Sequence, residues 1–274
     1  MATAATIPPT HTSRSPRGRR TWRIAGSILA VATILLGTAS LWSCASELTA
    51  DTETQQETYQ HAVTRIELDL DDGEISLTPG DEGEVVIERR LEWSDDKPVI
   101  EETWVGDTLK ITSRCGESAI GTKTHCAVAY TMRVPADVEI DAHTRASLID
   151  VRGLGGSLRL TESSGDVKVT DTTGTLWVQA SSGGITAIGV RADKVEVEAT
   201  SGDVDLRLAA APGTLTVTTK AGNVDIAVPG DDAYDVTVQT SGGDKDVTVR
   251  QENPAERTIG VTTSRGDVRI GYAS

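Results

Sequence analysis

Residues 194–228 read KVEVEATSGDVDLRLAAAPGTLTVTTKAGNVDIAV and contain the same unit twice. The first copy starts with the triplet VEV at Val195 and reaches a glycine, Gly202, seven positions later. The second copy starts with LTV at Leu215 and reaches Gly222 at the same interval. A short run that alternates Val, Ile or Leu with polar residues follows each glycine. This alternation has the period of a half-buried β-strand and never that of a helix.

The unit recurs six times in the second half of the chain, at intervals of 18 to 23 residues between its glycines. Its copies start at Leu158, Leu176, Val195, Leu215, Val236 and Ile259, and their glycines are Gly165, Gly183, Gly202, Gly222, Gly243 and Gly266. A period near twenty with two short strands per unit is typical of a stacked β architecture. The sequence therefore predicts an all-β solenoid whose coils are about 20 residues long.

The glycines are the expected corners of the coils. A chain that turns sharply between two strands usually needs one residue with a positive φ, which glycine adopts without steric cost. An Asp, Asn or Gly follows each of these glycines, and we expect the Asp and Asn side chains to hydrogen-bond the local backbone. This is a structural explanation of the recurring SGD, AGN and RGD segments.

An early copy of the unit runs from Ile66 to Gly73, far from the others. Residues 84–134 break the pattern and contain two longer strand-like stretches and the segment TWVGDTLKI, which is typical of a hairpin around Gly106. We expect this part to be an antiparallel insert that covers the first end of the stack, because an open end exposes apolar side chains and unpaired backbone. The last copy, which ends at Tyr272, is expected to form the other end.

The charge of the 274-residue chain, −15 in total, is divided unevenly. Residues 1–43 hold five Arg and no acidic residue, which leaves 21 basic and 41 acidic residues, a net −20, in the remainder. An acidic domain repels phosphate backbones and anionic lipid, so nucleic acid is an unsuitable partner. The simplest interpretation of this charge is solubility outside the cell.

A segment of 19 residues without a charge, from Ile24 to Trp42, is long enough to cross a bilayer. The Arg residues that precede it predict a cytoplasmic N-terminus and an external acidic domain. We therefore expect a disordered basic tail at 1–22, a transmembrane signal-anchor at 23–43, a polar linker at 44–60 and an extracytoplasmic β-repeat domain at 61–274. Two alternatives stay open: a cleaved secretory signal, and a lipoprotein signal that would make Cys44 a lipidation site.

The other two cysteines, Cys115 and Cys126, are separated by ten residues. Outside the cytoplasm such an isolated pair is most simply a disulfide that closes a small loop. A metal site with His125 is the alternative, but structural zinc needs four ligands, more than this segment offers.

No residue set in the sequence specifies a reaction. The four histidines fit no triad or metal spacing, and one acid per corner gives too few oxygens for Ca²⁺. Arg265-Gly266-Asp267 matches a cell-attachment tripeptide but occupies the repeat's own corner position. We accordingly expect no catalytic residue, no cofactor and no metal site.

The units SSGDVKV, TSGDVDL, KAGNVDI and SRGDVRI, together with the membrane anchor, resemble the bacterial putative-adhesin, β-strand-repeat family of unknown function, which occurs in the envelopes of actinomycetes and other Gram-positive bacteria. The resemblance covers residues 61–274. It implies a single-stranded right-handed β-helix at the cell surface and supplies no catalytic residues.

Three functions follow as hypotheses. The first is a non-catalytic surface module, an adhesin or structural protein of the envelope that binds cell-wall glycan or an envelope protein. The second is an accessory or sensory ectodomain that acts through a membrane partner in envelope stress. The third is a polysaccharide-active β-helix enzyme, which the lack of any catalytic constellation disfavours. The sequence specifies neither the ligand nor the oligomeric state.

Overall fold

The computed structural model describes residues 50–116 and 125–273, and in these ranges the chain is all-β. The described part contains no helix, and therefore no helix that is long and apolar enough to cross a membrane. The expected tail (1–22), signal-anchor (23–43) and lipidation site (Cys44) lie outside the described residues.

The strands form two sheets of eleven strands each, most of them parallel to their neighbours. The first sheet contains, in spatial order, β1 (Asp51–Gln60), β4 (Glu84–Trp93), β7 (Cys126–Val134), β3 (Ile75–Pro79), β9 (Ile149–Arg152), β11 (Val167–Thr170), β13 (Ile185–Val190), β15 (Val204–Leu208), β17 (Val224–Val228), β22 (Val268–Tyr272) and β19 (Lys245–Val247). The second sheet contains β5 (Val99–Val105), β6 (Thr108–Arg114), β2 (Arg65–Leu70), β8 (Glu139–Thr144), β10 (Leu158–Ser164), β12 (Leu176–Ser182), β14 (Lys194–Ser201), β16 (Thr214–Ala221), β21 (Thr258–Arg265), β18 (Ala233–Thr240) and β20 (Arg250–Gln251).

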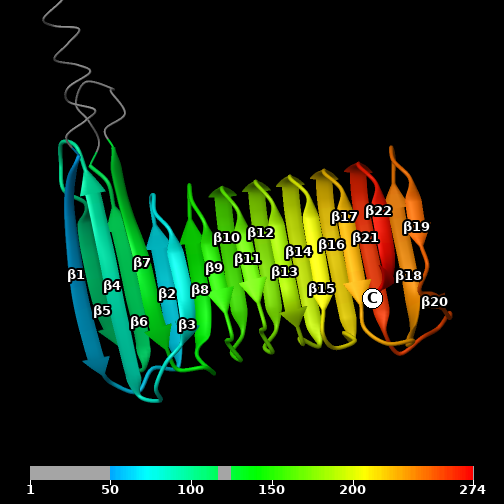
Figure 1. Ribbon diagram of the computed structural model, residues 1–274, viewed down its shortest axis with the longest axis horizontal. Helices are drawn as coiled ribbons and strands as arrows, with labels where there is room; N and C mark the ends of the chain where they lie inside the picture. Colours follow the sequence, from blue (N-terminus) through cyan, green and yellow to red (C-terminus); the bar gives the residue numbers. More distant parts are fainter. Residues whose placement is uncertain (1–49, 117–124, 274) are drawn as a thin grey trace, which may run out of the picture. The chain divides into compact units, whose positions relative to one another are not determined.

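Each repeat unit is one coil of a stack, with one strand in each sheet (Figure 1). The apolar triplet lies on the strand of the second sheet, and the run after the glycine forms the strand of the first. Equivalent residues pair in register, so that Leu158 lies beside Ile140 on one side and beside Leu176 on the other. The two-strand unit predicted from the sequence is thus confirmed, while the handedness of the coil stays a prediction.

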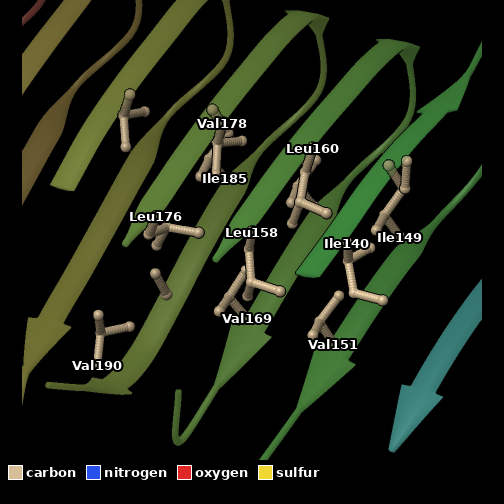
Figure 2. Close-up of a cluster of buried hydrophobic side chains, with 14 of the residues drawn as sticks. Ile140, Ile149, Val151, Leu158, Leu160, Val169, Leu176, Val178, Ile185 and Val190 are labelled. Atoms are coloured by element: carbon tan, nitrogen blue, oxygen red, sulfur yellow. The ribbon is translucent and has the colours of Figure 1, made fainter. Parts of the chain in front are cut away.

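The core fills the space between the two sheets. Figure 2 shows Ile140, Leu158 and Leu176 from the second sheet, with Ile149 and Val169 from the first, among the side chains of this layer. All five are buried. The chain has no Phe, and Val, Ile, Leu and Ala supply nearly all of this thin interior. Because each strand alternates, its other side chains face solvent and form flat, regular outer surfaces.

The early copy forms the coil β2/β3, which pairs directly with the coil β8/β9. The insert between these two copies in sequence lies on the outer side of β2/β3: β6 pairs with β2, and β7 pairs with β3. The hairpin β5/β6 and the pair β4/β7 are antiparallel. The expected antiparallel insert at the first end of the stack is confirmed.

The polar linker expected at 44–60 is wrong for residues 51–60. These residues form β1, which pairs along its whole length with β4. The segment DTETQQETYQ has no apolar alternation because its inward positions, apart from Tyr59, hold polar side chains, so hydrophobic periodicity could not reveal it. The compact unit accordingly begins at Ala50 and not at residue 61.

The last two coils exchange places relative to their order in the sequence. The C-terminal coil β21/β22 lies between β16/β17 and the coil β18/β19, as Figure 1 also shows. The expectation that the C-terminal coil forms the end of the stack is therefore wrong. The far end consists of β18, β19 and the short strand β20. The strands that carry Arg265 and Arg269, β21 and β22, pair with β18 and β19.

The corner glycines are required for two reasons, and only the first was visible in the sequence. With Gly73 of the first coil there are seven, and all except Gly165 have φ between +132° and +143°, which L-residues with a side chain rarely adopt. The second reason is a close approach of stacked backbones. A Cβ on Gly202 would lie 1.9 Å from the carbonyl oxygen of Gly183, and one on Gly165 would lie 1.7 Å from that of Ser147.

The Asp or Asn after the corner glycine bonds the next coil and not its own turn, which corrects the expectation of a local bond. Oδ1 of Asp203 accepts a hydrogen bond from the backbone N–H of Asn223 at 2.7 Å. Asn223 accepts in the same way from Asp267 at 3.0 Å, and Asp267 from Asp244 at 2.8 Å. This ladder provides acceptors for backbone N–H groups at the corners, which strand pairing leaves without a partner.

We predict that Gly202→Ala destabilises the protein by about 3 kcal/mol or more, because a single methyl group overlaps the carbonyl of Gly183 and the φ of +138° disfavours it. Thermal unfolding followed by circular dichroism measures the effect. Gly260→Ala is the matched control, since a Cβ at Gly260, on β21 of the same stack, meets no atom within 4 Å. Equal melting temperatures for the two variants would contradict the steric explanation.

We also predict that Asp203→Ala lowers the free energy of unfolding by about 1 kcal/mol, because the N–H of Asn223 loses its acceptor. The control is Asp244→Ala, at the last rung of the ladder, whose carboxylate accepts no hydrogen bond from the described residues. Urea unfolding should separate the two variants. A loss of the same size in both would show that corner charge and not the ladder is responsible.

Candidate functional site

The strands β1, β4 and β5 lie at the N-terminal end of the stack (Figure 1). Their side chains border a cleft between the two sheets. Its volume is about 380 Å³. The residues that line it are Gln55, Glu57, Tyr59, Arg89, Leu91, Lys97, Pro98, Ile100 and Glu102. Unlike the rest of the space between the sheets, this part is mainly polar.

The alternation of β1 and β5 explains the polar lining. Every second residue of β1 faces the inside, so Gln55, Glu57 and Tyr59 occupy positions that hold Val, Ile or Leu in the other coils. Gln55 lies directly opposite Arg89 of β4. Across the cleft, β5 contributes Glu102 in the same manner. The stack therefore ends in a polar layer, as terminal repeats require for solubility.

Arg89 is the centre of this layer. Its side chain is only 12 % exposed, and it forms an ion pair and hydrogen bond with Glu102, which is 13 % exposed. Nε of Arg89 donates to Oε1 of Gln55 at 2.6 Å. The hydroxyl of Tyr59 donates to the other oxygen of Glu102. A nearly buried charge pair is stable only when further hydrogen bonds complete it, and here Gln55 and Tyr59 provide them.

Tyr59 of the cleft and the buried Tyr130 behind it stay protonated at neutral pH. Burial raises the pKa of Tyr59 to about 12, and its hydrogen bond to Glu102 contributes to the increase. Burial likewise raises the pKa of Tyr130, which lies opposite Arg89 on the neighbouring strand β7. Tyr59 therefore acts as a hydrogen-bond donor. This arrangement holds polar groups in fixed positions and suits ligand recognition through hydrogen bonds.

Aromatic side chains gather beside the cleft. The ring of Trp104 meets that of Tyr59 edge-on at 5.5 Å and that of His61 at 4.6 Å. The ammonium of Lys97 lies 5.4 Å from the centre of the Trp93 ring and 2.7 Å from a carboxylate oxygen of Glu53. In a chain with few aromatic residues, this end of the stack is the richest part of the described region.

Sequence reasoning did not find the cleft. Its central residues, Arg89 and Glu102, are 13 positions apart in sequence and belong to different sheets. The one available signal was that the inward positions of residues 51–60 are polar, and it could be recognised only after β1 was known to be a strand.

The residues singled out in the sequence serve the scaffold. All seven corner glycines, including Gly73 of the first coil, form the turns described above. The structure joins Cys115 and Cys126 in a disulfide, which links the end of β6 to the start of β7 and so ties the two sheets together. None of these residues lines the cleft.

A second hollow, of about 440 Å³, lies at the far end of the stack, along the corner ladder. Asp225, Asp244, Asp246 and Asp267 line it, and Arg269 lies between Asp225 and Asp246 at 3.3 and 3.7 Å. Asp267 already accepts a backbone hydrogen bond. Over the described ranges, no group of three or more His, Cys, Asp or Glu side chains is arranged to hold a metal ion.

Glu162 is a buried carboxyl away from both hollows. It occupies an inward position on β10, between Thr144 and Ala180 of the neighbouring strands, and is 1 % exposed. Oε1 accepts a hydrogen bond from the N–H of Ser164 at 2.8 Å, whereas Oε2 has no partner among the described residues. Burial raises the pKa of Glu162, and the nearby carboxylate of Asp72 adds to the increase.

Comparison with known families decides the classification. The model of the Toastrack DUF4097 family matches residues 63–211 and again residues 157–271. The chain belongs to the Toastrack DUF4097 family. The two matches overlap over residues 157–211, as expected when one repeat pattern can be aligned with the stack in two positions. The resemblance to a β-repeat family noted in the sequence is confirmed.

Several solved structures resemble this Toastrack chain. A putative adhesin from Bacteroides fragilis has 12% identity and a TM-score of 0.44, over 81% of this chain and 97% of that one. A putative adhesin from Parabacteroides merdae has 14% identity and a TM-score of 0.42, over 80% and 97%. A putative cell adhesion protein from Clostridium sporogenes has 11% identity and a TM-score of 0.36, over 82% and 100%. No curated protein matches the sequence.

We predict that Glu162→Gln stabilises the protein near neutral pH by about 1 kcal/mol or more, because an ionised carboxylate with an unpaired oxygen is costly to bury. The folded-state pKa is raised above the ordinary 4.5, so Glu162 contributes most to stability below pH 4.5 and less as the pH rises through the folded-state pKa. The advantage of the Gln variant should therefore shrink as the pH falls toward 4.5.

Melting temperatures of both proteins between about pH 4 and pH 8 test this linkage. Glu88→Gln, on the exposed face of β4, is the control and should leave the pH profile unchanged. A constant difference between wild type and Glu162→Gln over this range would contradict the prediction.

Proposed function

We propose that this Toastrack protein is a non-catalytic binding module of the cell surface, an adhesin or envelope protein that holds a ligand at the N-terminal end of its stack. The observation that carries the proposal is the cleft between β1, β4 and β5. Its polar groups are fixed by one another and by two sheets before any ligand arrives. Sites of this kind lose little conformational entropy on binding.

The stack supports such a role mechanically. Neighbouring coils are joined by parallel strand pairing, by the close contact of the corner glycines and by the Asx ladder. The cleft is therefore held at one end of a rigid stack, the end nearest in sequence to the proposed membrane attachment. Alternating outward side chains give the rest of the stack regular polar faces.

The proposed location follows from the N-terminal sequence. The uncharged segment from Ile24 to Trp42, preceded by five Arg, supports a signal-anchor at 23–43 with the β domain outside the cell. Lipidation at Cys44 is the alternative form of attachment. In both forms residue 50, where the described domain begins, lies close to the membrane attachment in sequence.

We predict that the full-length chain, purified in detergent, is retained saturably on cell walls isolated from its host and releases no soluble sugar from them. Co-sedimentation measures the retention, and a reducing-sugar assay measures the release. Retention should persist in Glu162→Gln, which leaves the surface unchanged.

Two results would contradict the proposal. Release of soluble sugar would favour the polysaccharide-active enzyme. Absence of retention, together with photocrosslinking of a single membrane protein from Val99 beside the cleft, would favour the accessory or sensory ectodomain; Val99 is 59% exposed and suits such a probe.

A further inference from the structure

We propose that the N-terminal cleft binds an uncharged oligosaccharide and that Glu57 and Arg89 share one of its hydroxyl groups. The proposal rests on the proposed function, because it names the ligand class of the same cleft. Three features carry it: an open donor–acceptor pair, a balance of charge, and an apolar wall beside polar groups.

The open pair is formed by Nη2 of Arg89 and Oε1 of Glu57, which lie 3.7 Å apart. This distance is too long for a hydrogen bond. Nε and Nη1 of the same guanidinium are engaged by Gln55 and Glu102, which leaves Nη2 as the nitrogen that faces Glu57. Glu57 is 48% exposed, and this is its only ion pair among the described residues. One guanidinium nitrogen and one carboxylate thus face each other across a gap.

A hydroxyl group placed beside this pair can bridge it, because it is both a donor and an acceptor. Its oxygen can accept from Nη2 of Arg89 while its hydrogen is donated to Glu57. A carboxylate or phosphate of a ligand would meet the negative charge of Glu57, and an ammonium would meet the guanidinium of Arg89. The geometry therefore favours an uncharged hydroxyl over either kind of ion.

The charge of the whole lining agrees with this choice. The charges of the lining residues sum to zero, since Arg89 and Lys97 balance Glu57 and Glu102, while Glu53 beside the lining pairs with Lys97. The rest of the domain is strongly acidic, since residues after 43 carry −20 in total. An acidic surface repels anionic polymers and attracts cations nonspecifically. The neutral cleft is thus a local exception, suited to a ligand that the overall field neither attracts nor repels.

The apolar part of the lining consists of Leu91, Pro98 and Ile100. A sugar ring presents C–H groups on its faces and hydroxyls at its rim, so it can cover such a wall while its hydroxyls reach the polar groups. The volume of about 380 Å³ lies within the range of small-ligand sites, about 300–1,000 Å³. The network of Arg89, Gln55, Glu102 and Tyr59 holds the guanidinium still, which reduces the entropic cost of binding.

The test is isothermal titration calorimetry of the full-length chain in a zwitterionic detergent, because glycoside detergents would compete for the site. The probes are the linear hexasaccharides maltohexaose, cellohexaose, mannohexaose and xylohexaose, each up to about 10 mM, with hexagalacturonate as the anionic comparison. We expect at least one neutral hexasaccharide to bind saturably and more tightly than hexagalacturonate.

The variants locate the site. Glu57→Ala removes the acceptor from an exposed position and should weaken binding at least about tenfold with an unchanged melting temperature. Arg89→Lys replaces the planar guanidinium by an ammonium and should also weaken the binding of the hexasaccharide. The matched control is Glu88→Ala, an exposed Glu on β4 that is absent from the cleft lining, which should bind like wild type.

Three outcomes would overturn the inference: no binding of any neutral probe, tighter binding of hexagalacturonate, or full binding by Glu57→Ala. The first would mean that the polar layer only closes the end of the stack. If walls retain the protein in that case, the binding module stands and its ligand is of another class; if they do not, both proposals fail.

Discussion

The structure depends on the close approach of backbones at the corners of the coils. Each corner glycine lies so near the carbonyl of the coil before it that a methyl group would overlap that oxygen, as at Gly202 over Gly183. In-register strand pairing sets the height of one coil on the next, and at that height only a residue without a Cβ fits the corner. The Asx ladder exists because of the same contact, since only adjacent corners bring the side chain of Asp203 to the N–H of Asn223.

A stack of this kind must end, and its two ends differ. At the far end β18 closes one sheet together with the two-residue β20, and the three-residue β19 closes the other. At the N-terminal end β4, β6 and β7 of the insert continue the apolar core, whereas the outermost strands, β1 and β5, turn Gln55, Glu57 and Glu102 inward. Because polar side chains do not pack as an apolar core does, they satisfy one another around Arg89 and leave a cleft. The candidate site is thus a consequence of the way in which the repeat is terminated.

Much of the scaffold could be predicted from particular residues. The triplets and the glycines located the coils, Gly106 located the hairpin, and the early copy at Ile66 showed that the insert interrupts the stack. Other features could not be predicted. The strand at 51–60 has no apolar period, and the exchange of the last two coils leaves no signal, because every coil offers the same register to any other coil.

The sequence by itself determined the unit of the fold, since alternation and glycine spacing are local properties that physical chemistry converts directly into strands and corners. Only the tertiary structure decided the order of the units and the content of the ends. The order depends on which of several equivalent edges a strand meets, and the cleft depends on Arg89 and Glu102 approaching across two sheets. Both depend on contacts between residues far apart in sequence, so neither can be predicted from the residue pattern of a single coil.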